Sequence, residues 1–243
     1  MTTGLTARQT NLLKTIIDEY IESAEPVGSL AIEKKYNLGV SPATIRNEMA
    51  NLTKNGYLRQ PHTSAGRVPT PAAMKFYISQ LMEEKDMGLA SEVKVKEGMK
   101  EQKLDFDRLM EEATEALARE THSLAIASTS DGDAWRSGFS NIYEIPEFFG
   151  APMVCKSVFS FLEEPKTLHE LLFERLTGLS PIEVLFGEEF GWPYFEPVGI
   201  VASRFSVKGK SGAIGVVGSF GQNYPEIIPV VRKIKGFIED FAK

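Results

Sequence analysis

The stretch 41–54 presents side chains of the types that contact bases and phosphates in nucleic acids. Three apolar residues, Ile45, Met49 and Leu52, recur at i, i+4 and i+7, which predicts a helix with one narrow buried stripe. Arginine can pair with guanine and asparagine with adenine in the major groove, so a helix face that carries both is a candidate for reading DNA. The face opposite the stripe is small, basic and rich in amides, and it holds Ala43, Arg46, Asn47, Ala50, Asn51 and Lys54.

The same residues also fit an ordinary amphipathic helix whose polar side faces solvent. Arg46 flanks the apolar stripe, and an alternative is that it pairs with Glu48 or Glu25 and never touches DNA. The neighbouring elements are needed to choose between these interpretations.

Two helices are predicted before this one. A capping-box pattern followed by paired apolar residues predicts a helix over residues 6–23. A second helix is expected over residues 29–36, with Ser29 as its cap and with Leu30 and Ile32 buried. The chain therefore begins with helices that need a partner for their apolar sides.

The third helix has clear signals at both ends. Ser41 can accept a hydrogen bond from a free backbone N–H, and Pro42 fits the first helical position, which needs no donor. Gly56 suits a left-handed end, and residues 37–40 form a turn around Gly39. Two short helices joined by about four residues, the second one basic, are typical of a helix-turn-helix.

Residues 57–69 predict two short strands joined by a polar turn at 63–66, which is the form of a wing. Arg59 and Arg67 would lie on its two arms, near a phosphate or the minor groove. Thr70 is expected to cap the next helix. Three helices and a hairpin make a winged helix-turn-helix, and we predict that this one binds double-stranded DNA.

The predicted contacts come from the third helix, the wing and the helix that follows it. Thr44, Arg46 and Asn47 are expected to reach base edges or adjacent phosphates, while the wing and nearby lysines hold phosphates and set the register. The predicted DNA-binding set is Ser41, Ala43, Thr44, Arg46, Asn47, Lys54, His62, Thr63, Ser64, Arg67 and Lys75.

The charge distribution favours local docking on a phosphate backbone. The chain has 243 residues and a net charge of -6. Residues 28–80 nevertheless contain seven basic and two acidic residues, a local net charge of +5, so the other 190 residues carry -11. Two alternatives stay open, a winged-helix module that docks a protein partner and a ligand-sensing regulator without operator specificity. The basic wing favours DNA over the protein-docking module, and the ligand-sensing alternative would need a ligand that shifts thermal stability.

The composition limits the class of protein. Hydrophobic content of 42% and charged content of 25% describe a soluble globular chain. The single cysteine, Cys155, excludes an internal disulfide and suits a reducing cytoplasm. No apolar run approaches the length of a membrane span, and the N-terminus lacks the pattern of a signal peptide. We expect a cytoplasmic protein.

No group of residues predicts catalysis, a cofactor or a metal. The glycines of Gly212-x-x-Gly215-x-x-Gly218 lie in a strand pattern without nucleotide-loop spacing, which favours close strand packing. Cys155 lies among apolar residues and is expected to be a buried structural thiol. The chain has three histidines, which lack the spacing of metal ligands: His62, His122 and His169. Ser128 and Ser140 are not surrounded by the sequence of a nucleophile elbow. We therefore expect a protein that is not an enzyme.

The remainder of the chain predicts helices mixed with strands. A helical stripe is expected from Leu104 to Arg119, after a charged, solvated segment. Predicted strands cover residues 124–128, 181–187, 198–207 and 213–219, with helices over 153–176, interrupted at Pro165, and over 224–242. The fold class expected is α+β.

Three runs of this sequence resemble signature motifs of the bacterial heat-inducible transcription repressor HrcA family. They are 25–29, 41–47 and 61–70, and further resemblance appears at 140–148 and 181–189. The resemblance implies an N-terminal winged helix-turn-helix followed by a GAF-like α+β domain. It also implies a repressor that binds an inverted-repeat operator ahead of chaperone genes and depends on the GroEL chaperonin. An inverted repeat needs two copies related by a two-fold axis, so we expect a homodimer.

The chain resembles a shortened member of that family. The family pattern has a long segment, with part of the GAF-like sheet and an inserted dimerisation domain, where this chain has only residues 129–145. A dimer would therefore form through the C-terminal domain, the 104–120 helix or the winged-helix face. We predict a DNA-binding domain over residues 1–85, a helical linker over 86–122 and a reduced GAF-like domain over 123–243.

Overall fold

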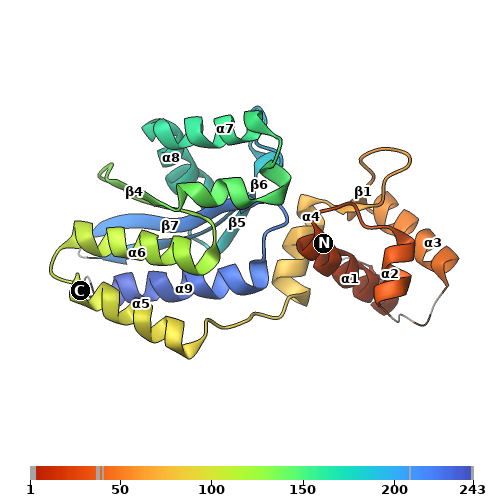
Figure 1. Cartoon of the computed structure of the whole chain (residues 1–243), viewed down its shortest axis with the longest axis horizontal. Coiled ribbons are helices and arrows are strands. Elements are labelled where there is room, and N and C mark those ends of the chain that lie inside the picture. The colour runs from red at the N-terminus through yellow and green to blue at the C-terminus, as the bar shows by residue number, and fades with distance from the viewer. Residues whose placement is uncertain (1–3, 37–38, 40, 208, 242–243) are drawn as a thin grey trace. The chain divides into compact units, whose positions relative to one another are not determined.

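The computed structural model describes residues 4–36, 39, 41–207 and 209–241. The chain divides into two compact units, an N-terminal unit (Met1–Glu83) and a C-terminal unit (Glu84–Lys243) (Figure 1). Each unit has its own buried core, and each is described separately below.

The N-terminal unit is a set of short helices with a two-stranded hairpin. Strands β1 and β2 pair antiparallel, and the loop between them projects from the helices (Figure 1). The winged helix-turn-helix arrangement predicted from the sequence is confirmed. Its elements are α1 (Ala7–Ser23), α2 (Ser29–Lys35), α3 (Pro42–Lys54), β1 (Leu58–Arg59), β2 (Val68–Pro69), α4 (Pro71–Phe76) and a π-helical turn η1 (Tyr77–Leu81).

Local signals explain most of these boundaries. Thr6 and Gln9 form the predicted capping box at the start of α1, and the Thr70 hydroxyl accepts a hydrogen bond from the backbone N–H of Ala73 at the start of α4. The α3 helix ends at Lys54, and Gly56 follows in the left-handed region at φ 81°. The sequence therefore contained the information for the ends of three helices.

The prediction for α2 was partly wrong. Its N-cap is Gly28, which makes no side-chain capping bond, whereas Ser29 is the first helical residue. Ile32 is fully buried, but Leu30 is 56% exposed. Residues two apart lie about 200° around a helix, so Leu30 and Ile32 cannot face the same core. The predicted turn at 37–40 lies, except for Gly39, outside the described residues.

Burial of α1 against the other helices stabilises the N-terminal unit. One contact inside this core is polar: the Tyr77 hydroxyl donates a hydrogen bond to Asp18 at 2.6 Å. Burial raises the pKa of Tyr77, and the hydrogen bond to Asp18 raises it further, so the hydroxyl keeps its proton at neutral pH. The apolar core includes Leu12, Leu13, Ile16, Ile17, Ile32, Ile45, Met49, Leu52 and Met74.

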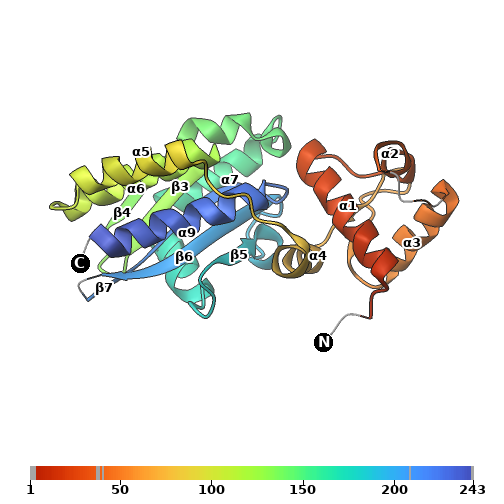
Figure 2. The same ribbon diagram turned by 90° about the horizontal axis from the view of Figure 1, so that it is seen from below.

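The C-terminal unit is built on a five-stranded antiparallel sheet in the order β4-β3-β7-β6-β5 (Figure 2). The long central hairpin β6–β7 pairs Val198 with Ser219 at one end and Val207 with Lys210 at the other. Strand β7 therefore starts three residues earlier than the sequence predicted. The strands are β3 (Leu124–Thr129), β4 (Ala134–Ser137), β5 (Glu183–Phe186), β6 (Val198–Val207) and β7 (Lys210–Ser219).

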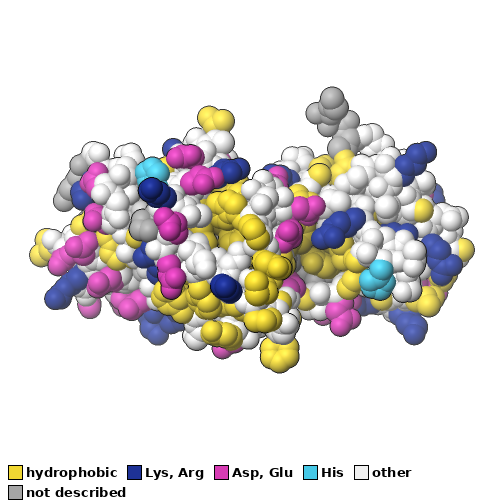
Figure 3. All heavy atoms as spheres, turned by 90° about the horizontal axis from the view of Figure 1, so that it is seen from above, with side chains coloured by type: hydrophobic (Ala, Val, Ile, Leu, Met, Phe, Trp, Pro, Cys, Tyr) yellow, Lys and Arg dark blue, Asp and Glu magenta, His cyan; other side chains and the backbone are white. Residues whose placement is uncertain are grey.

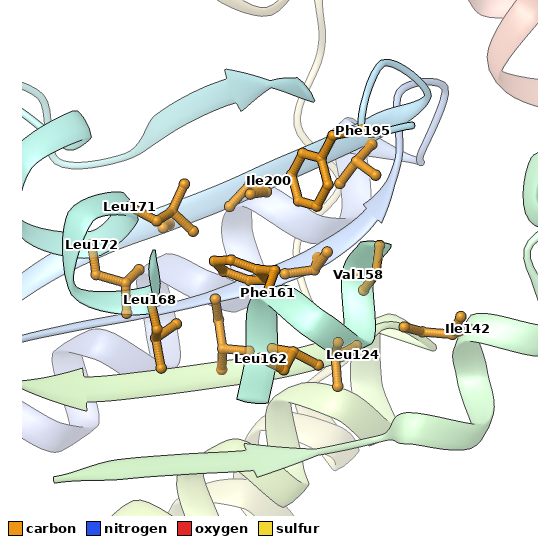
Figure 4. Close-up of a cluster of buried hydrophobic side chains, with 14 of the residues drawn as sticks. Leu124, Ile142, Val158, Phe161, Leu162, Leu168, Leu171, Leu172, Phe195 and Ile200 are labelled. Carbon is orange, nitrogen blue, oxygen red and sulfur yellow. The ribbon is translucent and has the colours of Figure 1, made fainter. Parts of the chain in front are cut away.

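Helices cover both faces of this sheet (Figures 1 and 2). On one face lie α5 (Leu89–Glu101), α6 (Phe106–Thr121) and α9 (Tyr224–Phe241). On the other lie α7 (Pro152–Glu163), α8 (Pro165–His169) and the π-helical turn η4 (Glu170–Arg175), whose side chains pack on alternate residues of the strands (Figure 4). Three short 3-10 helices complete the unit, η2 (Phe139–Glu144), η3 (Pro146–Phe148) and η5 (Gly187–Glu189). The α+β class is confirmed.

Helices α5 and α6 come from the segment that the sequence suggested as a linker. They pack within the C-terminal unit, where Phe106 at the start of α6 meets Trp135 of β4 edge to face at 5.8 Å. Leu104, placed in the helical stripe by the sequence, lies in the turn between α5 and α6 and is 94% exposed. The stripe itself, from Leu109 to Ala118, is buried as predicted.

The three spaced glycines lie on β7, and two of them, Gly212 and Gly215, permit close packing on β6, as predicted, whereas a Cβ on Gly218 would meet the Gln222 side chain. A Cβ on Gly215 would come within 2.4 Å of the Val201 carbonyl oxygen, and one on Gly212 within 2.2 Å of the Phe205 ring. Cys155 is half-buried rather than fully buried.

Candidate DNA-binding surface

The N-terminus of α3 is fixed by its own cap. The Ser41 hydroxyl oxygen accepts a hydrogen bond from the Thr44 backbone N–H at 3.3 Å, and the two hydroxyls lie 3.0 Å apart. Both residues belong to the predicted DNA-binding set, and the structure gives them this local role. Pro42 occupies the first turn of α3, where its missing N–H is not needed.

One face of α3 is exposed and lacks large apolar groups. Asn47 and Asn51 lie one turn apart on it, between the small residues Ala43 and Ala50, and Lys54 ends the row. The small side chains allow a close approach, and the two amides can each form a bidentate contact with adenine. Asn51 was not in the predicted set, although its i+4 spacing from Asn47 was a usable signal.

Arg46 is exposed beside this face and is not occupied by the acidic residues proposed as alternatives. The Glu48 carboxylate turns toward α1 instead, where it accepts a hydrogen bond from Gln9 at 3.0 Å and lies 4.0 Å from the Arg8 guanidinium. Within the part of the chain that the structure describes, neither Glu48 nor Glu25 forms an ion pair with Arg46. Arg46 is therefore available to an external anion.

The wing is held in a defined shape by hydrogen bonds within its loop. The Gln60 side-chain amide donates to the backbone oxygens of Thr63 and Ala65, at 3.0 and 2.9 Å. The His62 ring and the Ser64 hydroxyl lie 3.2 Å apart. A loop tied at these points presents Thr63 and Ser64 at a fixed position, which lowers the entropy cost of binding.

The base of the wing is joined to the segment between α1 and α2. Val27 and Arg67 exchange two backbone hydrogen bonds, both of 2.8 Å. Gly66 allows this approach, because a Cβ there would lie 2.5 Å from the Val27 carbonyl carbon. The wing therefore has little freedom to swing relative to the helices.

Arg67 is directed toward α3. Its Nε donates a hydrogen bond to the Thr53 hydroxyl at 3.2 Å, and that hydroxyl in turn donates to the Met49 carbonyl at 2.8 Å. Thr53 is a positioning residue that the sequence analysis missed, since nothing in its local pattern shows which wing side chain will reach it.

A cleft of about 430 Å³ separates α3 from the wing, and Arg46 of α3 and Arg67 of the wing both line it. Of the predicted set, Arg46, Thr63, Ser64 and Arg67 line it together, with Gln60 beside them. None of the residues that line the cleft is acidic, so the two guanidinium groups set its charge, and the hydroxyls of Ser29, Thr63 and Ser64 add polar groups. The other predicted residues, namely Ser41, Ala43, Thr44, Asn47, Lys54, His62 and Lys75, do not line it.

The described residues contain no group of three or more His, Cys, Asp or Glu side chains placed to hold a metal ion. Across those same parts of the chain, no helix is both long enough and apolar enough to span a bilayer.

A helix-turn-helix with a wing, followed by an α+β unit, is the architecture of a transcription regulator. The sequence matches the family model described as HrcA protein C terminal domain over residues 70–228. The chain belongs to the HrcA family.

Curated relatives agree with this assignment. The heat-inducible transcription repressors HrcA of Symbiobacterium thermophilum and Acetivibrio thermocellus are 44% and 40% identical to this chain over 121 and 124 residues. Those matches cover about half of this chain and only 36% and 35% of the relatives, so the chain spans about a third of the length of the curated relatives it matches. The relatives are named as repressors, which confirms the expectation that this is not an enzyme.

A solved structure supports the fold. A crystal structure of a hypothetical protein superposes with a TM-score of 0.78 over 98% of both chains at 21% sequence identity. At that identity the likeness concerns the fold alone.

Proposed function

We propose that this chain is a transcription repressor that binds double-stranded DNA at an inverted-repeat operator through α3 and the wing. The observation that carries the proposal is the acid-free cleft that Arg46 of α3 and Arg67 of the wing line together. Two guanidinium groups along a fixed cleft suit a phosphate backbone, since each planar guanidinium donates in pairs to phosphate oxygens.

Phosphate contacts come from the cleft, and base contacts come from the exposed face of α3. A phosphate in the cleft sets the register, and the small-residue face of α3 then enters the major groove with Asn47 and Asn51 toward base edges. Arg46 accordingly holds a phosphate rather than a base. Ala43 belongs to that small-residue face, and the remaining predicted residues supply the surrounding backbone contacts: Ser41, Thr44, Lys54, His62, Thr63, Ser64 and Lys75.

The family resemblance extends the proposal to the regulated genes. We place the operator ahead of chaperone genes, with the GroEL chaperonin as a regulatory partner. A two-fold operator requires a homodimer. We keep the predicted division into a DNA-binding domain (1–85), a helical segment (86–122) and a GAF-like domain (123–243) as part of this proposal.

The test is electrophoretic mobility shift of the full chain with the family's inverted-repeat operator and with a scrambled duplex of equal length. Selective binding with two protomers per duplex is expected. Two cleft arginines in each of two protomers give about four phosphate contacts, so affinity should fall at least roughly a hundredfold between 50 and 200 mM salt. Equal binding to both duplexes, or no DNA binding, would overturn the proposal; the latter would favour a protein-docking module.

A further inference from the structure

The C-terminal unit exposes a group of large hydrophobic side chains around η2, η3 and the start of α7. Phe149 is 85% exposed and Tyr143 68%, and Phe139 and Met153 are almost half exposed. Figure 3, which faces α7, shows hydrophobic side chains gathered on this side of the unit. We call this surface the aromatic patch, and it consists of Phe139, Tyr143, Phe149, Met153 and Phe159.

The aromatic patch is preformed rather than loose. Phe159 stacks on Phe139 with ring centroids 6.5 Å apart and packs against Tyr143 at 6.2 Å. The segment that carries these rings is anchored by Asn141, whose side-chain amide donates to the Ser123 carbonyl at 2.9 Å. Gly138 precedes it at φ 81°, where a Cβ would lie 2.5 Å from that carbonyl oxygen. The rings are therefore displayed on a fixed backbone.

A hollow adjoins the protruding rings. A cleft of about 490 Å³ lies between Tyr143, Phe159 and the N-terminal turn of α7, and its lining is mostly apolar. Phe149 stands at the rim of this cleft. A protruding side chain, Phe149, and an apolar cleft thus lie side by side on one surface. A two-fold interface between identical copies requires this arrangement, because the protruding side chain of each copy then enters the cleft of the other.

The exposed area matches what a homodimer needs. A fully exposed aromatic side chain offers about 200 Å², so the three exposed rings and the half-exposed Met153 present about 500 Å² of apolar surface. A standard interface buries about 800 Å² per partner, of which about 65% is apolar in homodimers, or about 520 Å².

The charges beside the aromatic patch are also complementary under two-fold symmetry. Lys156 lies on the cleft wall, and Glu144 and Glu147 lie on the η2–η3 side. Among the described residues of their own chain, these three form no ion pair. A two-fold axis through the patch would set the lysine of each copy against the carboxylates of the other.

We propose that the aromatic patch is the site at which a second copy of this chain binds, with Phe149 of each copy entering the cleft of the other. The proposal rests on the proposed function in one respect, because the inverted-repeat operator supplies the reason for a two-fold dimer.

Sedimentation velocity of the full chain from 0.5 to 100 µM tests the interface. The wild type should be a dimer in the micromolar range, and Phe149→Glu should weaken dimerisation at least roughly 30-fold. Phe149 is exposed, so this substitution leaves the core intact, which circular dichroism checks. The matched control is Leu104→Glu, a leucine at the α5–α6 turn on the opposite face of the sheet, and it should dimerise like the wild type. A monomeric wild type at 100 µM, or a Phe149→Glu variant that dimerises normally, overturns the proposal.

The single cysteine provides a readout at the site itself. Cys155 lines the cleft and is half-buried, so dimerisation should slow its reaction with a thiol reagent as the protein concentration rises. In Phe149→Glu the rate should not depend on concentration. A concentration-independent rate in a wild type that does dimerise would place the interface elsewhere and overturn the proposal.

The two proposals fail in different ways. A patch-dependent dimer that does not prefer the operator would refute the proposed function and leave this interface standing. Selective operator binding by a protein whose Phe149→Glu variant still dimerises would refute only the interface.

Discussion

Gly66→Ala tests whether the wing owes its position to one close backbone contact. The added Cβ would lie 2.5 Å from the carbonyl carbon and oxygen of Val27 and 2.6 Å from the Pro26 oxygen. Backbone atoms cannot rotate away as the end of a flexible side chain can. The base of the wing would have to separate from the segment between α1 and α2.

The cost follows from what that separation breaks. Two backbone hydrogen bonds between Val27 and Arg67 would be lost, at about 1 kcal/mol each, and forced overpacking adds about 1–3 kcal/mol. The total of about 3–5 kcal/mol is a large part of the stability of a small domain. For a unit of this size it corresponds to a fall in Tm of more than about 10 °C.

Calorimetry of the full chain measures the effect, and Gly28→Ala is the matched control. Gly28 lies next to the same contact, but a Cβ there meets nothing within 4 Å and its φ is -95°. We expect a loss of no more than about 1 kcal/mol from the control, as the N-cap changes from Gly to Ala. Equal melting of Gly66→Ala and wild type would refute the reasoning, and so would equal losses in the two variants. Operator binding should fall with Gly66→Ala even below its melting temperature, since Arg67 adjoins the displaced residue.

Three further predictions concern the same chain. Asn47→Ala should reduce the preference for operator over scrambled duplex roughly 5- to 150-fold, and the slope of log affinity against log salt concentration should not change. Arg46→Ala should instead weaken binding to both duplexes and reduce that slope by about 0.9 per protomer. Mobility shifts at several salt concentrations distinguish the two outcomes. Gln9→Glu keeps the capping-box acceptor but sets a carboxylate against Glu48, where Gln9 now donates at 3.0 Å. Repulsion between the two raises carboxyl pKa values in the folded state, so Tm should fall at pH 7 and recover toward wild type near pH 4. Burial raises the pKa of Glu112 above 4.5, so its charged form opposes folding, and Glu112→Gln should raise Tm at pH 7 while leaving it unchanged at pH 4.

The sequence contained enough information to predict the helices of the N-terminal unit because their signals are local. A cap such as Ser41 acts on an N–H three residues away, and the spacing of Ile45, Met49 and Leu52 depends only on the helix period. The strand positions of the central hairpin were likewise visible in runs of β-branched residues. Strand β4 was missed because it is only four residues long and has Arg136 in its centre.

The candidate site was less predictable, because its geometry depends on contacts between residues far apart in the sequence. Thr53 and Arg67 are separated by 14 positions, and Gln9 and Glu48 by 39. No periodicity shows that Arg67 turns toward α3, or that Arg46 has no acidic partner on its own helix. The residue types of the proposed DNA contacts were therefore available from the sequence, but the division of these residues between the cleft and the exposed face of α3 was not.

The position of Glu48 shows why that division matters for a surface that faces DNA. Glu48 is the one acidic residue of α3, and on an isolated helix it would pair with or repel whatever lies nearby. In the folded unit its carboxylate is held by Gln9 and Arg8 of α1. In the proposed function, helix α1 thus contributes to recognition without lining the DNA site, because it engages the only negative charge that α3 could present to a phosphate. The charge of the binding face is a property of the packed unit and cannot be read from the helix alone.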